Sequence, residues 1–513
     1  MAGLTVPGSS RGPDVRRFVL ELDRRLERLD RGILVADWDL YTGRSTAGSS
    51  RWQLRRSELL GGPGLLDWIR RARQQSRADA VGRRLQLLER VVVDASAEQV
   101  PGIVRLRTEL QRKIAAFRPS WDGRRVNRAV VYRALRNDAD PDRRRRAYRA
   151  FEPLHRSLEP GSLELVRLRN ARARELGFRS VAEMRLGFQG LTVARYEELA
   201  EEATAGVAAH ARRLRDSLPP AERAGGWHPW DLAYARRRRC RLADRRFPTR
   251  TMLPRILRAV GRWGFRTDRM RFRVVLHDLP AGGLTLAPDP PDDVRILVHP
   301  QGGWDAYHVM FHEVGHAVHS ASIRAPRHLL RWHENVPGFG AFHEGIGGLF
   351  EEISRDVGWL TDGAGIPRDR AERFAEAHAD DDLFAVTGLR TWVLPELRLY
   401  DRPDRDPMPE ALRLERQLLG VDRSEPRSFV DPFFVEMPIY ASNYLLAALF
   451  HHQVMEAICR ELGTPLWPNR SVGLWLTTNW FADGSTFDWV PRLREVTGRP
   501  FGARAFRNHF RAT

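Results

Sequence analysis

Apolar side chains recur every three to four residues along most of the chain, which is the spacing of helices that bury one face. In the first third of the chain this spacing predicts helices over 15–29, 54–73, 81–98 and 100–117. Gly61-Gly62-Pro63-Gly64 breaks the second of these helices. Two short β-like runs, 272–276 and 294–298, flank a proline-rich stretch at 279–293. The pattern predicts a mainly α protein with a small β-sheet.

A further apolar-rich run, from Trp304 to Val318, has no internal proline and is expected to form a helix. It contains His312-Glu313-Val314-Gly315-His316. Residues four apart lie on one helical face, so His312 and His316 can point at the same ion. Glu313 projects beside them toward a water on that ion. The spacing predicts a catalytic zinc site and metal-assisted hydrolysis.

A catalytic zinc usually takes three protein ligands and leaves one position for water. Residues 337–348 read as a turn followed by a second buried helix, in which Glu344 lies among apolar residues. Because an unpaired buried charge is costly, we expect Glu344 to be the third ligand. Three other side chains compete for that place, namely His343, Glu351 and Glu352. His308 and His319 share the face of the motif helix and are expected to support the ligands or to lie at the surface.

The segment 312–352 resembles the peptidyl-dipeptidase A family, the angiotensin-converting-enzyme type, whose pattern is H-E-x-G-H followed by P-G-F-H-E-A-I-G. Gly340 and Ala341 interrupt the second motif here. The residues around His312 also resemble the thimet and oligoendopeptidase F family. Further similarities lie at 37–42, 168–178 and 230–234. The resemblance implies a large, helical, two-lobed gluzincin fold around a deep cleft, with the small sheet beside the motif helix.

Tyr440 to Cys459 reads as one long apolar helix. By the same resemblance, Tyr444 falls at the place of a tyrosine that donates a hydrogen bond to the oxyanion, with Tyr440 as the alternative. A core tyrosine with a satisfied hydroxyl is the other interpretation of Tyr444.

The same alignment shows four departures from the converting-enzyme pattern. Phe434 stands in place of a transition-state histidine, and Pro432 in place of a lysine that binds the substrate carboxylate. Asn443 replaces a chloride-linked arginine, and Gly348 replaces an aspartate that orients a zinc histidine. The usual anchor for a peptide C-terminus is therefore missing. We expect Glu351, one turn after Gly348, to take over the orienting role.

In the related families an edge strand near 282–286 pairs with the substrate backbone. Gly282-Gly283-Leu284-Thr285-Leu286 could do so here, and such pairing would tolerate varied side chains. A surface loop is the competing interpretation of this segment.

The length of 513 residues, 42% of them hydrophobic, is sufficient for a large buried core. We expect one peptidase domain over 1–513, with an N-terminal helical lobe at 1–220 and a catalytic zinc-binding region at 230–513. The two cysteines, Cys240 and Cys459, cannot supply a disulfide framework, which favours a reducing compartment. No apolar block typical of a signal peptide or a membrane span is present, so we expect a cytoplasmic protein without a membrane partner.

The net charge of +19 raises the possibility of a nucleic-acid partner. The densest basic runs, 143–146 and 236–239, can instead pair with nearby acids such as Asp138, Asp142 and Asp244. No zinc-finger spacing or RNA-recognition signature is present, so we expect no nucleic-acid partner.

Together these features predict a zinc-dependent peptidase that hydrolyses short oligopeptides, as an oligopeptidase or a peptidyl-dipeptidase. One zinc ion would be held by His312, His316 and Glu344, with Glu313 as general base and Tyr444 as oxyanion donor. A zinc-binding homologue without turnover, acting as a binding or scaffold protein, is the alternative, and a basic nucleic-acid binder is the third.

Overall fold

The structure of the protein is a computed structural model, which describes most of the chain. The described residues are 6–7, 13–76, 79–220, 227–239, 241–277, 279, 282–300, 302–326, 328–331, 336–421, 423, 430–463 and 465–511. Cys240 lies outside them, as does part of the proline-rich stretch at 279–293.

The predicted helices of the first third of the chain are present. They are α1 (Pro13–Tyr41), α2 (Ser50–Leu60), α3 (Leu65–Gln75), α4 (Ala80–Glu98) and α5 (Pro101–Ala116). The predicted break separates α2 from α3, and Gly64 at its end has a φ of +73°, which favours glycine. Asp79 caps α4 by accepting hydrogen bonds from the backbone N–H groups of Val81 and Gly82.

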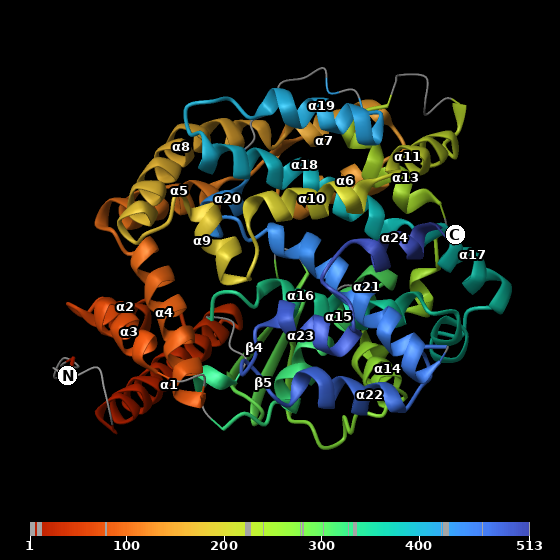
Figure 1. Cartoon of the computed structure of the whole chain (residues 1–513). Coiled ribbons are helices and arrows are strands. Elements are labelled where there is room, and N and C mark those ends of the chain that lie inside the picture. Colours follow the sequence, from red (N-terminus) through yellow and green to blue (C-terminus); the bar gives the residue numbers. More distant parts are fainter. Residues whose placement is uncertain are drawn as a thin grey trace.

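A short hairpin and a second group of helices follow. They are β1 (Ser120–Trp121), β2 (Arg124–Arg125), α6 (Arg128–Asn137), α7 (Pro141–Arg149), α8 (Glu152–Glu175), α9 (Val181–Phe188), α10 (Val193–Thr204), α11 (Val207–Asp216), α13 (Pro229–Arg238), the 3-10 turn η1 (Asp244–Arg246) and α14 (Thr249–Gly261). Figure 1 shows α5, α8, α10 and α11 on the upper side of the molecule, away from the sheet.

The small sheet has three strands, β3 (Phe272–Leu276), β4 (Gly283–Asp289) and β5 (Asp293–Val298), in the order β3-β5-β4. β3 runs parallel to β5, and β4 runs antiparallel to it with Gly283 opposite Val298. The segment 282–286 therefore belongs mostly to an edge strand and not to a surface loop. β4 and β5 both pack against α15 (Trp304–Ser322), which carries the predicted motif, as Figure 1 shows.

The rest of the chain is helical. Its elements are η2 (His328–Leu330), α16 (Gly340–Glu351), η3 (Glu352–Arg355), η4 (Trp359–Gly363), α17 (Arg368–His378), α18 (Asp381–Asp401), α19 (Met408–Leu419), α20 (Pro432–Glu436), α21 (Ser442–Leu462), α22 (Ser471–Leu476), η5 (Thr477–Phe481), α23 (Trp489–Thr497) and α24 (Arg504–Arg511). The mainly helical fold with a small sheet beside α15 agrees with the prediction from the sequence.

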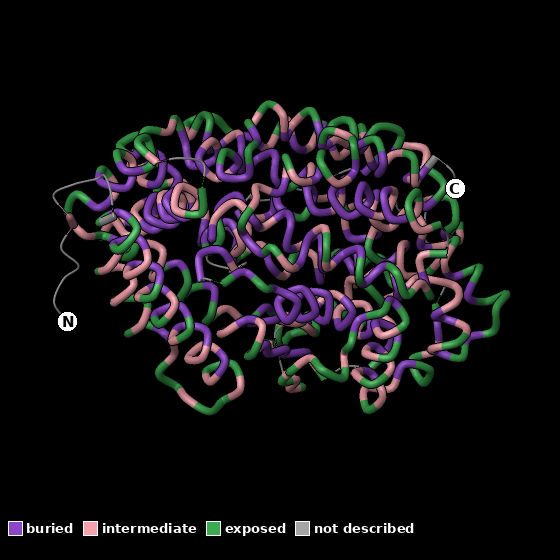
Figure 2. Tube along the Cα trace, turned by 60° about the horizontal axis from the view of Figure 1, so that its bottom comes forward, coloured by how far each residue is buried: buried purple, intermediate pink, exposed green. Residues whose placement is uncertain are grey.

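Helix α16 packs between α15 and α21 in the middle of the molecule. Glycines allow this close approach: a Cβ on Gly315 of α15 would lie 3.0 Å from Phe350, and one on Gly345 of α16 would lie 2.5 Å from Phe450. The main core cluster contains residues from Val15 to Phe510, and Figure 2 shows the buried segments running through the interior. The three helices that carry the predicted site therefore lie within the main core.

The arginine runs make ion pairs within the chain, as predicted. Arg143 binds Asp138 at 2.6 Å, and the buried Arg144 binds Asp231 at 2.6 Å. In the second run Arg236 lies 3.2 Å from Asp381. Asp138 is one of the acids expected from the sequence. Asp231 and Asp381 were not expected, because they are distant in sequence from the arginines they bind.

No helix among the described residues is both long enough and apolar enough to cross a membrane.

Candidate functional site

The two histidines of the motif face each other on α15. Nε2 of His312 lies 2.8 Å from Nε2 of His316 and 3.3 Å from Oε2 of Glu344 on α16. The potential ligand atoms of the three residues all lie within 4.8 Å of one another. Two imidazole nitrogens and one carboxylate oxygen are the donor set of many catalytic zinc sites. The donor chemistry and its convergence therefore fit a divalent metal ion.

The electrostatics around His312 also favour a cation. Burial disfavours a charged ring, but the carboxylates of Glu351 and Glu344 raise the pKa of His312 well above its ordinary value. The opposite nitrogen of the ring, Nδ1, lies 3.0 Å from Oε1 of Glu351. This is the contact expected from Glu351 in place of the missing aspartate. A carboxylate at Nδ1 directs the lone pair of Nε2 toward the other two side chains.

A second histidine shares the Glu351 carboxylate. Nε2 of His308 lies 3.6 Å from Oε1 of Glu351, and Nδ1 of His308 lies 2.9 Å from the hydroxyl oxygen of Ser354. Burial alone would raise the pKa of Glu351, but His308 and His312 lower it to about 2. His308 therefore supports the cluster from outside, as expected from its place on the helix.

Glu313 points from α15 toward the edge strand β4. The hydroxyl of Thr285 donates a 2.6 Å hydrogen bond to Oε2 of Glu313, whose side chain is almost fully buried. A Cβ on Gly283 would lie only 2.5 Å from Cγ of Glu313, so glycine is needed where the strand passes the carboxylate. Burial raises the pKa of Glu313 to about 7. The edge strand thus sets the position of this side chain.

The other histidines and acids near the site make different contacts. The ring of His343 stacks on that of His316 with centroids 3.7 Å apart, and burial lowers its pKa well below the ordinary value. His319 is fully buried, and burial lowers its pKa to about 3. Glu352 lies toward α21, with Oε1 3.7 Å from Nε2 of His451. Among the competitors considered, Glu344 is the carboxylate that groups with both motif histidines.

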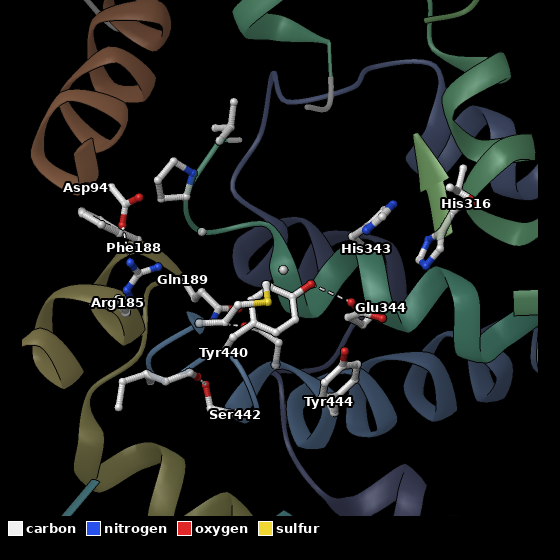
Figure 3. A pocket seen from close by; sticks show the side chains of 18 of the residues that line it. Asp94, Arg185, Phe188, Gln189, His316, His343, Glu344, Tyr440, Ser442 and Tyr444 are labelled. Carbon is white, nitrogen blue, oxygen red and sulfur yellow. Dashed lines mark hydrogen bonds and ion pairs between the residues drawn. The ribbon is translucent and has the colours of Figure 1, made fainter. Parts of the chain in front are cut away.

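The two tyrosines have different surroundings. Tyr440 donates a 2.7 Å hydrogen bond to Oε1 of Glu344 (Figure 3), whereas Oε2 is the oxygen that lies 3.3 Å from Nε2 of His312. Tyr444 is 36% exposed and lines the same cavity, and burial of its hydroxyl region raises its pKa, which keeps the phenol protonated. The predicted helix begins at Ser442 and not at Tyr440. Ile439 has a φ of +62°, which interrupts the helix on that side.

The site opens into a cavity of about 600 Å³. Its walls come from α2, α4, α9, β4, α15, α16 and the start of α21, as Figure 3 shows in part. Two cationic side chains line it, Arg56, which lies 2.7 Å from Asp30, and Arg185, which lies 3.0 Å from Asp94. Sequence reasoning missed both arginines, because they lie far from the motifs along the chain.

The residues that depart from the converting-enzyme pattern have identifiable places. Phe434 is buried and stacks on Tyr400 with ring centroids 6.2 Å apart. Asn443 lines the cavity and accepts a 2.7 Å hydrogen bond from Gln189. Gly348 packs against His451, since a Cβ there would lie 2.7 Å from Nδ1 of that ring. The position of the missing transition-state histidine is thus part of the core.

No protein-family model matches the sequence, and no curated protein matches it. Solved structures match over nearly the whole chain. Trypanosoma cruzi metallocarboxypeptidase 1 has a TM-score of 0.68 at 16% identity, over 96% of this chain and 98% of that one. Pyrococcus furiosus carboxypeptidase, in a form described as Apo-Mg, has a TM-score of 0.68 at 15% identity, over 98% and 99%. The M32 carboxypeptidase of Deinococcus radiodurans has a TM-score of 0.65 at 16% identity, over 96% and 97%.

These similarities extend from end to end of both chains in each comparison. They do not single out the converting-enzyme or thimet families to which the sequence motifs are similar. The chain has the mainly helical fold, with its three-stranded sheet, that is found in these metallocarboxypeptidases.

Proposed function

We propose that the protein is a metal-dependent peptidase that removes residues from the free C-terminus of peptides. The observation that carries the proposal is the convergence of His312, His316 and Glu344 on one point, with Glu313 beside them on the wall of one cavity. The fold that the chain shares with three carboxypeptidases supports this choice over an oligopeptidase or a peptidyl-dipeptidase.

His312, His316 and Glu344 would hold one divalent ion, and zinc is the metal expected for two imidazoles and one carboxylate. A bound ion of this kind polarises a carbonyl group and makes a water molecule more acidic. Glu351 holds the ring of His312 through Nδ1, and Tyr440 holds the carboxylate of Glu344 through Oε1. Each of these two side chains is thus held by a hydrogen bond and would keep its other ligand atom, Nε2 of His312 or Oε2 of Glu344, for the ion.

Glu313 is the proposed general base. Its carboxylate would take the proton of the attacking water and then deliver it to the leaving amine. Thr285 donates to Oε2 of Glu313, so Oε1 is the oxygen that would accept the proton. Tyr444 would donate its phenolic proton in a hydrogen bond to the oxyanion, because it lines the cavity and stays protonated.

The peptide backbone would lie along β4. Only one side of this strand pairs within the described sheet, with β5, and Gly283, Leu284 and Thr285 line the cavity. Pairing to the free edge would bind peptides of varied sequence. Arg56 and Arg185 are the cationic side chains of the cavity wall, and we propose that one of them anchors the terminal carboxylate in place of the missing lysine.

The test uses a library of short peptides, each made with a free and with an amidated C-terminus. Metal-loaded protein should shorten only the free-carboxyl peptides, by one residue at a time as read by mass spectrometry, and a chelator should stop the reaction. Loss of two residues at a time would replace this proposal with a peptidyl-dipeptidase. Metal binding without any product would instead favour a non-catalytic metal-binding protein.

A further inference from the structure

A second group of side chains that could hold a metal ion lies beside α16, where Gly348 packs against His451. Asp382, at the start of α18, faces two adjacent histidines of α21, His451 and His452. Oδ2 of Asp382 lies 3.7 Å from Nε2 of His451 and 4.0 Å from Nε2 of His452. The potential ligand atoms of the three residues all lie within 4.8 Å of one another. In Figure 1 α21 runs beside α16 near the centre of the molecule.

A further carboxylate lies beside the group. Oε1 of Glu352, in η3, lies 3.7 Å from Nε2 of His451. These separations are too long for hydrogen bonds. They are close to the roughly 3.3 Å that separates donor atoms about 2 Å from a tetrahedral zinc ion. Small movements of the side chains would therefore bring the donors to ligand distance.

The two imidazoles present unused nitrogens to the cluster. His451 is 5% exposed and His452 is 3% exposed. The Nε2 atoms of both are buried and have no hydrogen-bond partner among the residues that the structure describes. Nδ1 of His452 lies 2.9 Å from the carbonyl oxygen of Ala448, which can only accept, so Nδ1 carries the proton of the neutral ring. The lone pair on Nε2 of His452 then faces the negatively charged carboxylate of Asp382, and the two repel each other. A cation between them would remove this repulsion.

The charges around the cluster also leave room for a cation. The guanidinium of Arg355 binds Oδ1 of Asp382 at 2.9 Å and Oε1 of Glu352 at 3.4 Å. Oδ2 of Asp382 is left facing the histidines. The two carboxylates outnumber the single guanidinium, which leaves one excess negative charge among these three groups. Because such a charge is costly away from water, a positive occupant stabilises the cluster.

We propose that Asp382, His451 and His452 form a second binding site for a divalent ion such as zinc. Two imidazole nitrogens and one carboxylate oxygen are donors that zinc accepts, and Glu352 is the adjacent carboxylate, with Oε1 3.7 Å from Nε2 of His451. The ion would join α18 to α21. Adjacent glycines of α16 serve the two sites, because Gly347 packs against His312 and Gly348 against His451.

The test measures zinc equivalents per chain in the full-length protein, by plasma mass spectrometry after saturation with Zn2+ and gel filtration in metal-free buffer. The wild type should retain two equivalents, and His312→Ala should retain one. Asp382→Asn, which preserves shape, should also retain one, and the double variant should retain none. These counts do not depend on peptidase activity. Zinc that His312→Ala keeps and Asp382→Asn loses belongs to the second site, whether or not the first site binds metal.

Two further variants keep the result interpretable if a histidine replacement fails to fold. Gly348→Ala should lower zinc affinity of the second site at least 10-fold by displacing His451. His509→Ala is the matched control, since its ring lies 4.9 Å from that of His452 but outside the group of ligand atoms, and it should retain two equivalents. No zinc retained by His312→Ala, or as much zinc in Asp382→Asn as in the wild type, would overturn the proposal.

Discussion

The hydroxyl of Thr285 donates a 2.6 Å hydrogen bond to Oε2 of Glu313, which joins the edge strand to the proposed general base. Thr285→Val keeps the shape of the side chain but removes this bond to a carboxylate, a bond of a kind that contributes about 1.5–3 kcal/mol. We expect kcat to fall roughly 10- to 100-fold while the metal content stays unchanged. Steady-state kinetics with parallel metal analysis check this result. Thr285→Ser retains the hydroxyl and should retain most of the activity; equal losses in both variants would count against the role of the hydrogen bond.

A second prediction concerns the metal ligands and Gly347. A Cβ at this position would overlap the ring of His312, so Gly347→Ala should displace the ring and weaken metal binding roughly 10- to 100-fold. A competition titration with a chelator of known affinity measures the change. Gly388→Ala is a matched control on α18, because a Cβ there meets no atom within 4 Å. If Gly347→Ala binds metal as tightly as Gly388→Ala does, His312 is not a ligand.

Replacing Tyr444 and replacing Tyr440 should affect different properties, the first kcat and the second metal affinity. Tyr444→Phe removes the proposed oxyanion donor and should lower kcat by about 10²-fold without changing metal affinity. Tyr440→Phe removes the hydrogen bond to Glu344 and should lower metal affinity by roughly 10-fold. Kinetics and metal titration on both variants decide between the roles. The reverse pattern would make Tyr440 the donor to the oxyanion.

The stability of the protein should fall as pH rises through the range set by Glu396. Burial raises the pKa of this carboxyl from 4.5 to about 8, and its Oε1 accepts a 2.7 Å hydrogen bond from the backbone of Ile439. A raised pKa means that the folded state holds the proton more tightly than the unfolded chain. The destabilisation caused by ionising Glu396 is therefore absent below pH 4.5, grows between pH 4.5 and about pH 8, and is complete above that pH.

Glu396→Gln keeps an acceptor for Ile439 and cannot ionise. The Tm of the wild type should fall more steeply than that of Glu396→Gln between about pH 5 and about pH 9, because each unit of pKa shift corresponds to about 1.4 kcal/mol. Calorimetry at several pH values checks the difference. Parallel curves for the two proteins would show that Glu396 does not titrate in this way.

Local patterns in the sequence were sufficient for the helices and for the grouping of His312, His316 and Glu344. The spacing of the two histidines fixes their shared face once the helix is accepted, and the apolar surroundings of Glu344 point to a partner for its charge. The contact between Glu351 and His312 was also predictable, since the pattern left an orienting role to be filled. The helices and the shared face of the two histidines depend on neighbours within one or two helical turns. Glu344 and Glu351 lie far from His312 in sequence, and they were linked to it by the need for a third ligand and by the resemblance to the converting-enzyme pattern.

Tertiary packing decided what the sequence could not predict. Arg56 and Arg185 reach one cavity from separate helices, and Asp382 meets His451 across a long stretch of chain. No short-range pattern connects such residues. The alignment with the converting-enzyme pattern was informative around the metal ligands, whereas Phe434 belongs to the core, where packing against Tyr400 explains it.

The general-base role of Glu313 is tested most directly by comparing Glu313→Gln with the wild type in one experiment that records metal content and kcat. Glutamine has nearly the same shape and can still accept the hydrogen bond from Thr285, but it cannot take a proton. The account predicts unchanged metal content and a kcat lower by about 10²- to 10⁴-fold on free-carboxyl peptides. Wild-type turnover in the glutamine variant, with the metal in place, would contradict it.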